Sequence, residues 1–152
     1  MVSMTLHWKL VMDSGDPHAQ ADFWADAMGY LVEDNSALIG QLLSQGHASD
    51  ADTVESHGRR AWRDLIAVRH PDDPYDEGTG VGLGRRILFQ RVPEAKTTKN
   101  RLHLDVHSAP GEREAEVERL EGLGATVLRR VKVPGGEWTL MSDPEGNEFC
   151  VH

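Results

Sequence analysis

The hydrophobic pattern of the chain begins with an alternating segment that is followed by a helical one. Apolar side chains occupy every second position across residues 6–12, which is the period of a half-buried strand. Asp16 and Pro17 then supply a helix N-cap and a first-turn proline, apolar residues recur at helical spacing over 21–28, and Gly29 stops the helix. This part of the chain therefore predicts a strand followed by a helix.

The same order returns in the second half of the chain. Residues 102–107 alternate as a strand, Pro110 and Gly111 open a helix, and Gly124 ends it. Each half is then expected to add three strands, which predicts a strand–helix–three-strand unit repeated twice. The added strands are residues 30–33, 62–68 and 86–92 in the first half, and 125–131, 137–141 and 148–151 in the second.

Extra material lies between the first two added strands, over residues 36–60. Ser36 is a candidate helix cap, and the apolar residues between 38 and 43 predict a short helix. The rest of this insertion is expected to be a loop or a second short helix. Residues 70–84 are rich in Asp, Pro and Gly, so they predict a surface connection.

Composition and charge narrow the classes of partner. A length of 152 residues suits one domain, or two small halves that share a core. The net charge of −9 argues against a nucleic-acid partner, because such binding depends on clustered Lys and Arg, and it favours cationic or neutral small molecules. The excess acidity is local, since residues 1–58 hold nine acidic groups and a single basic one, Lys9.

The sequence also bears on location. No apolar run approaches the ~20 residues that span a bilayer, and the N-terminal segment has neither a basic flank nor a long apolar stretch. We therefore expect no membrane partner and a cytoplasmic protein. Cys150 is the single cysteine and cannot form an internal disulfide, which agrees with a reducing compartment.

Several segments resemble the vicinal oxygen chelate (VOC) superfamily, which includes glyoxalase I, bleomycin-resistance proteins and extradiol dioxygenases. They are LVMDSGDPHAQADFWADAMGY in the first half and NRLHLDV, LEGLGATV and SDPEGNEFCV in the second, and they look most like the glyoxalase-like branch of bacterial proteins. The resemblance implies an α+β fold of two tandem βαβββ modules that form a curled mixed sheet around a cup. Module 1 would span residues 1–95 with the insertion 36–60, module 2 would span 100–152, and the single domain would form a homodimer.

In metal-using members of the superfamily, each module offers one ligand from its opening strand and one from its closing strand. In module 2 the opening position falls on His103 and the closing position on Cys150, with Glu148 on the same face as Cys150. Cys150 is either a thiolate ligand for a soft metal or a small apolar core residue.

Module 1 departs further from the pattern. Its opening position falls on Lys9 when counted from the helix start, and the distance to the helix-ending glycine does not decide between Lys9 and His7. Gln90 is the counterpart in the closing strand. The candidate metal ligands are therefore His103, Gln90 and Glu148, for a divalent Fe, Mn, Ni or Zn ion.

These positions predict a small-molecule site in the cup. The candidate ligand-binding residues are His7, Lys9, Trp62, Gln90, His103, Trp138 and Cys150. As an enzyme, the protein would be a metal-dependent lyase, isomerase or dioxygenase acting on an α-oxo thioester adduct or a catechol-like diol, and Glu148 would move a proton. The alternative is a bleomycin-resistance-like protein that sequesters a cationic drug or metabolite without chemistry, and a third reading is an interaction module with a vestigial cup.

Overall fold

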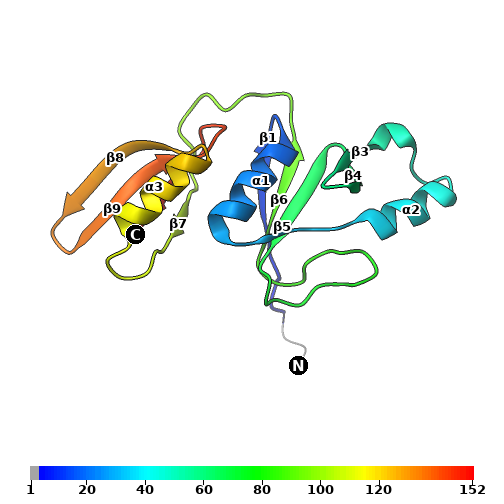
Figure 1. The fold of residues 1–152 in the computed structure, drawn as a ribbon, viewed down its shortest axis with the longest axis horizontal. Helices are drawn as coiled ribbons and strands as arrows, with labels where there is room; N and C mark the ends of the chain where they lie inside the picture. The colour runs from blue at the N-terminus through cyan, green and yellow to red at the C-terminus, as the bar shows by residue number, and fades with distance from the viewer. Residues whose placement is uncertain (1–3) are drawn as a thin grey trace. The chain divides into compact units, whose positions relative to one another are not determined.

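The computed structural model describes residues 4–152, so residues 1–3 of the predicted first module lie outside the described residues. The chain divides into two compact units, Met1–Val92 (unit 1) and Pro93–His152 (unit 2). Each unit contains a four-stranded sheet and a helix that packs on one face of it (Figure 1).

Unit 1 is built around the sheet β1-β6-β5-β2. The parallel pair of β1 and β6 lies at one edge, and the other neighbours are antiparallel. Helix α1 follows β1 and packs on β5 and β6. The elements of this sheet and its helix are β1 (Leu10–Ser14), α1 (Pro17–Met28), β2 (Leu31–Val32), β5 (Leu65–Arg69) and β6 (Arg86–Arg91).

The predicted caps of α1 are confirmed. The Asp16 carboxylate accepts a hydrogen bond from the backbone N–H of Ala19 at 3.2 Å, Pro17 is the first helical residue, and Gly29 ends the helix at φ +68°. Gly29 is suited to this position because it adopts the left-handed conformation without a Cβ penalty. The helix buries Trp24 against the sheet, where Phe89 is fully buried.

The first strand is shorter than the alternation predicted. It begins at Leu10 and not at Leu6, because its partner β6 begins at Arg86 and the register pairs Leu10 with Ile87. Leu6 and Trp8 precede the strand, and each is 87% exposed. Periodicity alone did not reveal where the partner strand starts.

The insertion contains a helix and a hairpin. Helix α2 (Ser36–Ser44) confirms the predicted short helix, but the rest is a one-turn 3₁₀ helix η1 (Asp50–Asp52) and a two-stranded sheet of β3 (Thr53–Ser56) and β4 (Arg59–Trp62). The expectation of a loop or second helix was wrong for this hairpin. His57 and Gly58 connect its strands with φ of 53° and 72°, which is the conformation of a tight hairpin turn.

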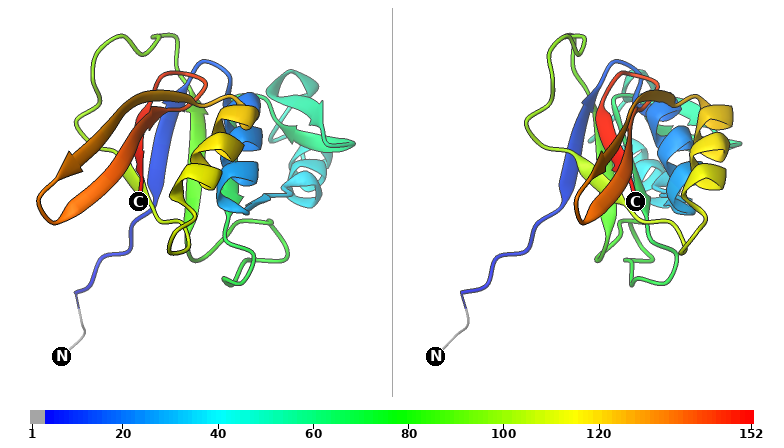
Figure 2. Two further views of the ribbon diagram at one scale, coloured as in Figure 1. Left: turned by 60° about the vertical axis from the view of Figure 1, so that its left-hand side comes forward. Right: turned by 90° about the vertical axis from the view of Figure 1, so that its left-hand side faces the viewer.

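Unit 2 repeats the topology of unit 1, in the order β7-β10-β9-β8 with β7 and β10 parallel. Helix α3 packs on β8 and β10 (Figure 2). Its predicted glycine stop is confirmed, since Gly124 has φ +118°. The elements are β7 (Leu104–Val106), α3 (Arg113–Leu123), β8 (Thr126–Val133), β9 (Gly136–Ser142) and β10 (Glu148–Val151).

The predicted fold class is confirmed, because both units show the βαβββ order, interrupted in unit 1 by the insertion, and both have the same order of strands across the four-stranded sheet. Parallel pairing of the first and last strands places the opening strand of each unit beside its closing strand. Within the described residues, no helix is long and apolar enough to cross a membrane.

Candidate functional site

The sheet of unit 2 has one face covered by α3 and one face that points away from it, here called the open face. On β10, Phe149 and Val151 are buried, and α3 packs on this strand. Because side chains alternate along a strand, Glu148 and Cys150 belong to the open face.

Strand register brings Cys150 next to the opening strand. Cys150 is the direct partner of Asp105 on β7 and of Leu140 on β9. His103 immediately precedes β7 and lies two residues before Asp105, so the strand period points both side chains toward the same face.

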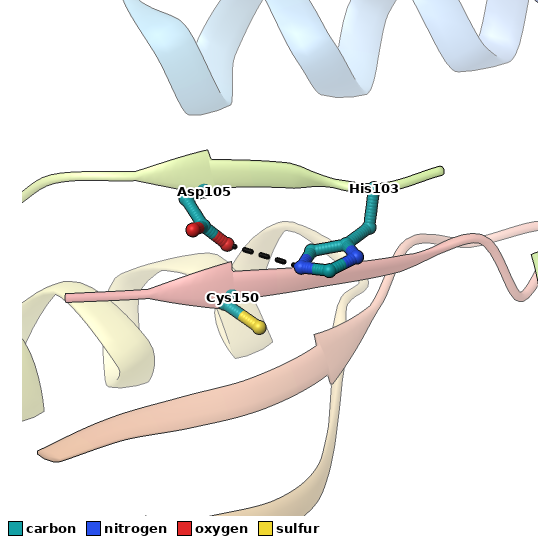
Figure 3. A group of neighbouring side chains, drawn as sticks. All are labelled: His103, Asp105 and Cys150. Atoms are coloured by element: carbon teal, nitrogen blue, oxygen red, sulfur yellow. Dashed lines mark ion pairs between the residues drawn. The ribbon is translucent and has the colours of Figure 1, made fainter. Parts of the chain in front are cut away.

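These three residues form a compact cluster. One ligand atom each from His103, Asp105 and Cys150 lie within 4.8 Å of one another, and His103 Nε2 is 3.2 Å from Asp105 Oδ1 (Figure 3). The side chains of His103 and Asp105 are 42% and 48% exposed, whereas Cys150 is buried. The cluster is thus reachable from solvent on its imidazole and carboxylate side.

The surroundings of Cys150 favour the protonated form of its thiol. Burial raises the pKa of Cys150, and the Asp105 carboxylate raises this pKa further through its charge and by accepting a hydrogen bond from the thiol. Lys99 acts in the opposite direction but more weakly. The second Asp105 oxygen lies 3.4 Å from His152 Nε2, so this carboxylate lies between two imidazoles.

A row of rings borders the cluster. The His152 ring stacks on His107 with centroids 5.0 Å apart and an interplanar angle of 25°, and it lies 5.8 Å from the ring of Trp138. Trp138 is half-buried on β9. The predicted residue Trp138 therefore adds flat apolar surface close to the polar cluster.

Glu148 has a different environment from the one expected of a proton-transfer residue. One carboxylate oxygen accepts a hydrogen bond from Lys96 Nζ at 3.0 Å, and the other accepts one from the backbone N–H of Asn100 at 3.1 Å. Burial alone would raise the pKa of Glu148, but these hydrogen bonds and the Lys96 charge hold that pKa below its usual value. Glu148 thereby ties residues 96–100 to the end of β10, and it is not part of the three-residue cluster.

The predicted residues of unit 1 are dispersed. His7 and Lys9 are exposed in the segment that precedes β1, and Gln90 is exposed on β6. The register places Gln90 directly opposite Asp13 of β1. The sequence placed Trp62 in a strand of the central sheet over residues 62–68, and this was wrong, because Trp62 lies on β4 of the hairpin. Its carbonyl oxygen is 2.8 Å from His18 Nε2.

The structure thus brings together two of the predicted site residues, His103 and Cys150, and adds Asp105. Asp105 was not among the predicted ligands, although its position two residues after His103 was enough to place it on the same face. His152 was also missed, because the closing strand was predicted to end at Val151, whereas the backbone of His152 still hydrogen-bonds to Val106 and Ser108.

The donor set of the cluster fits a divalent metal ion. Zinc binds imidazole nitrogen, carboxylate oxygen and thiolate sulfur at about 2.0–2.3 Å, so donor atoms that share one ion lie at most about 4.6 Å apart. The atoms of His103, Asp105 and Cys150 lie close to this limit or within it. Three protein donors also leave room for a fourth ligand from solvent or substrate.

Solved structures with the same architecture come from several bacteria. A glyoxalase/bleomycin resistance protein/dioxygenase family enzyme from Burkholderia phytofirmans is 14% identical, with a TM-score of 0.57 and 94% of each chain covered. A glyoxalase-related enzyme from Fulvimarina pelagi is 18% identical, with a TM-score of 0.53 over 96% of this chain and 87% of the other. A mutant of the fosfomycin resistance protein FosX from Listeria monocytogenes, complexed with Mn(II) and dihydroxypropylphosphonic acid, is 12% identical, with a TM-score of 0.57 over 99% and 90%.

The sequence itself places the chain in a family. It matches none of the curated proteins. The model of the glyoxalase-like domain, however, matches residues 9–152, which is nearly the whole chain. Together with the repeated βαβββ units, this match shows that the chain belongs to the glyoxalase-like domain family of the VOC superfamily.

Proposed function

We propose that the protein binds a small organic molecule on the open face of the unit 2 sheet, through a divalent metal ion held by His103, Asp105 and Cys150. The observation that carries the proposal is the convergence of three different donor atoms within 4.8 Å of one another, from β10, from β7 and from the residue before β7. A nitrogen, an oxygen and a sulfur donor grouped in this way are characteristic of divalent metal sites.

Related structures support a metal-dependent small-molecule site but do not identify the reaction. The FosX mutant structure holds Mn(II) and a small phosphonate, and the Burkholderia protein is an enzyme of the glyoxalase/bleomycin resistance protein/dioxygenase family. Identities of 12–14% support a common fold, and the fold hosts several reactions. The substrate and reaction therefore have to follow from the site itself.

The roles of the residues follow from their positions. A bound divalent ion would polarise a carbonyl or enediolate oxygen of the ligand. His103, Asp105 and Cys150 hold the ion, and Trp138 offers an apolar surface to the carbon skeleton of the ligand. Both oxygens of Glu148 are held by Lys96 and the Asn100 backbone N–H, so this carboxylate anchors residues 96–100 and takes no part in proton transfer.

A second candidate function is sequestration of a cationic ligand without chemistry. It is favoured by the poor donors at the matched positions of unit 1, where Lys9 is exposed and Gln90 lies opposite Asp13. The excess of acidic groups in residues 1–58 also favours a cation. The homodimer and cytoplasmic location expected from the resemblance and the sequence are compatible with either function.

Metal analysis separates the two functions. We expect protein purified without chelator and then loaded with a divalent ion to hold one equivalent, and His103→Ala to hold much less than one. His107→Ala is a matched control, because it removes an imidazole from the same face outside the cluster. If no divalent ion binds at any loading while aromatic amines or cationic glycopeptides raise the melting temperature, the metal-based function is wrong and sequestration is supported.

A further inference from the structure

We propose that Cys150 binds the metal as a thiolate, so that the site selects zinc or another thiophilic divalent ion over manganese and magnesium. This inference rests on the proposed function, because it assumes the metal centre at His103, Asp105 and Cys150. It goes beyond that function by naming the class of ion that the centre takes.

The first step of the argument is position. Cys150 is the direct partner of Asp105 across the β7–β10 ladder, and its sulfur lies beside the His103–Asp105 pair, within 4.8 Å of a ligand atom of each (Figure 3). It is only 6% exposed. A cysteine buried among apolar groups alone would be an ordinary core residue, but this one is within reach of an imidazole and a carboxylate.

The second step is the chemistry of the donors. The candidate ligands His103, Gln90 and Glu148 supply only nitrogen and oxygen, a set that Fe, Mn, Ni and Zn can all use. The structure instead groups one nitrogen, one oxygen and one sulfur. Thiolate sulfur favours zinc and similar ions over manganese and magnesium, which prefer oxygen.

The third step is the balance of charge and protons. A metal-bound thiol is deprotonated, so one proton leaves Cys150 for solvent when the ion binds. Asp105, which faces Cys150 across the β7–β10 ladder, would bind the ion as the second anionic ligand. The bound centre carries two anionic ligands and one neutral imidazole, which together neutralise a divalent ion.

The experiment is a titration of the full chain with Co(II), followed by absorption spectroscopy. We expect one equivalent of cobalt to produce a near-ultraviolet thiolate-to-cobalt charge-transfer band, which zinc abolishes by displacement and a large excess of manganese does not. Cys150→Ser should remove the band and weaken zinc binding by more than about tenfold, since losing an outer-shell partner of a metal site alone costs 10–100-fold.

Two controls keep the result interpretable. His107→Ala should retain the band. His103→Ala should lose it even though Cys150 is still present, so the test still has a result if the Cys150→Ser variant fails to fold. Cobalt binding without the charge-transfer band, or equal competition by manganese and zinc, would overturn the inference and leave the proposed function standing. Failure to bind any divalent ion would overturn both.

Discussion

Glu33 and Arg86 form a two-point ion pair inside unit 1. Arg86 donates from Nε to Glu33 Oε2 at 2.9 Å and from a terminal nitrogen to Oε1 at 2.7 Å, and the two side chains are 9% and 1% exposed. The backbone N–H of Gly82 also donates to Oε2, at 2.8 Å. The ion pair and the Gly82 hydrogen bond therefore hold residues 70–85, which connect β5 to β6, against the end of β2.

We predict that Glu33→Ala lowers the free energy of unfolding by about 3–5 kcal/mol, because it leaves the Arg86 charge buried without its partner. Denaturant unfolding checks this value. Arg130→Ala is the control, since its ion pair with Glu114 is more than half exposed on both sides and its loss should change the free energy of unfolding little. Equal losses in the two variants would contradict the burial of the Glu33 pair.

The same connection depends on Gly80. Its φ is +76°, and a Cβ at this position would lie 1.9 Å from the backbone oxygen of Asp34. Gly80→Ala must therefore shift the backbone of the connection. Gly29 also has positive φ but open space around it, so Gly29→Ala should lose only the conformational penalty of about 1–2 kcal/mol.

We expect Gly80→Ala to be the more destabilising of these two substitutions, and to increase the rate of limited proteolysis within residues 70–85. Equal free energies of unfolding for the two variants would contradict this prediction, because they would show that the backbone near Asp34 shifts at little energetic cost. Proteolysis confined to another part of the chain would also contradict the close approach.

The buried tryptophan of α1 provides a test of the core. Trp24 is 1% exposed, whereas Trp8 is 87% exposed. Trp24→Ala should lower the free energy of unfolding by about 3–5 kcal/mol, and Trp8→Ala should change it by no more than about 0.5 kcal/mol. A large loss for Trp8→Ala would contradict its exposure and indicate that an assembly of chains buries this side chain.

Local signals in the sequence were sufficient for three helix ends and for the repeat. They were wrong for the start of α3, which begins at Arg113 and not at Pro110 and Gly111, where Gly111 has φ +79°. Asp16, Gly29 and Gly124 mark helix ends through their own backbone preferences, so no knowledge of the rest of the fold is needed. The start of β1 depends instead on the partner strand β6, which pairs only from Leu10 onward. A strand boundary of this kind is a property of two distant segments.

The site residues likewise divide into those that local sequence signals place and those that depend on distant segments. The face on which His103 lies was predictable from the alternation of side chains along a strand. The same alternation places Asp105, two residues later, on that face. The environment of Glu148 was not predictable in this way, because Lys96 lies 52 positions away and reaches the carboxylate only after the chain has folded. Trp62 was misplaced because the hairpin turn at His57 and Gly58 was not recognised.

The pH dependence of stability should report on Asp73. Arg85 donates to this carboxylate from its side chain at 2.8 and 2.9 Å and from its backbone N–H at 2.7 Å, and these contacts hold the pKa of Asp73 well below its usual value. His70 lies 4.0 Å away and acts in the same direction.

A lowered pKa in the folded state means that the stabilisation by Asp73 is fully present above the ordinary aspartate pKa of about 3.9. It is lost as the pH falls below that value and through the folded-state pKa. We therefore expect Asp73→Asn to be less stable than the parent at pH 7 by an amount that stays constant down to about pH 5 and then shrinks. The difference in unfolding free energy, measured by urea titration at each pH, checks this; a difference that grows on acidification would contradict it.

The last prediction separates an anchoring role of Glu148 from a role at the metal. Because its carboxylate is held by Lys96 and Asn100 and is outside the three-residue cluster, Glu148→Gln should leave the metal stoichiometry and the cobalt spectrum unchanged. It should instead loosen residues 96–100, since the amide loses the charge that pairs with Lys96, and hydrogen exchange of the Asn100 amide should become faster. Lys96→Met provides the matched control, because it removes the same ion pair from the other side and should reproduce both results. Loss of metal in Glu148→Gln but not in Lys96→Met would instead make Glu148 a ligand, as the resemblance had implied.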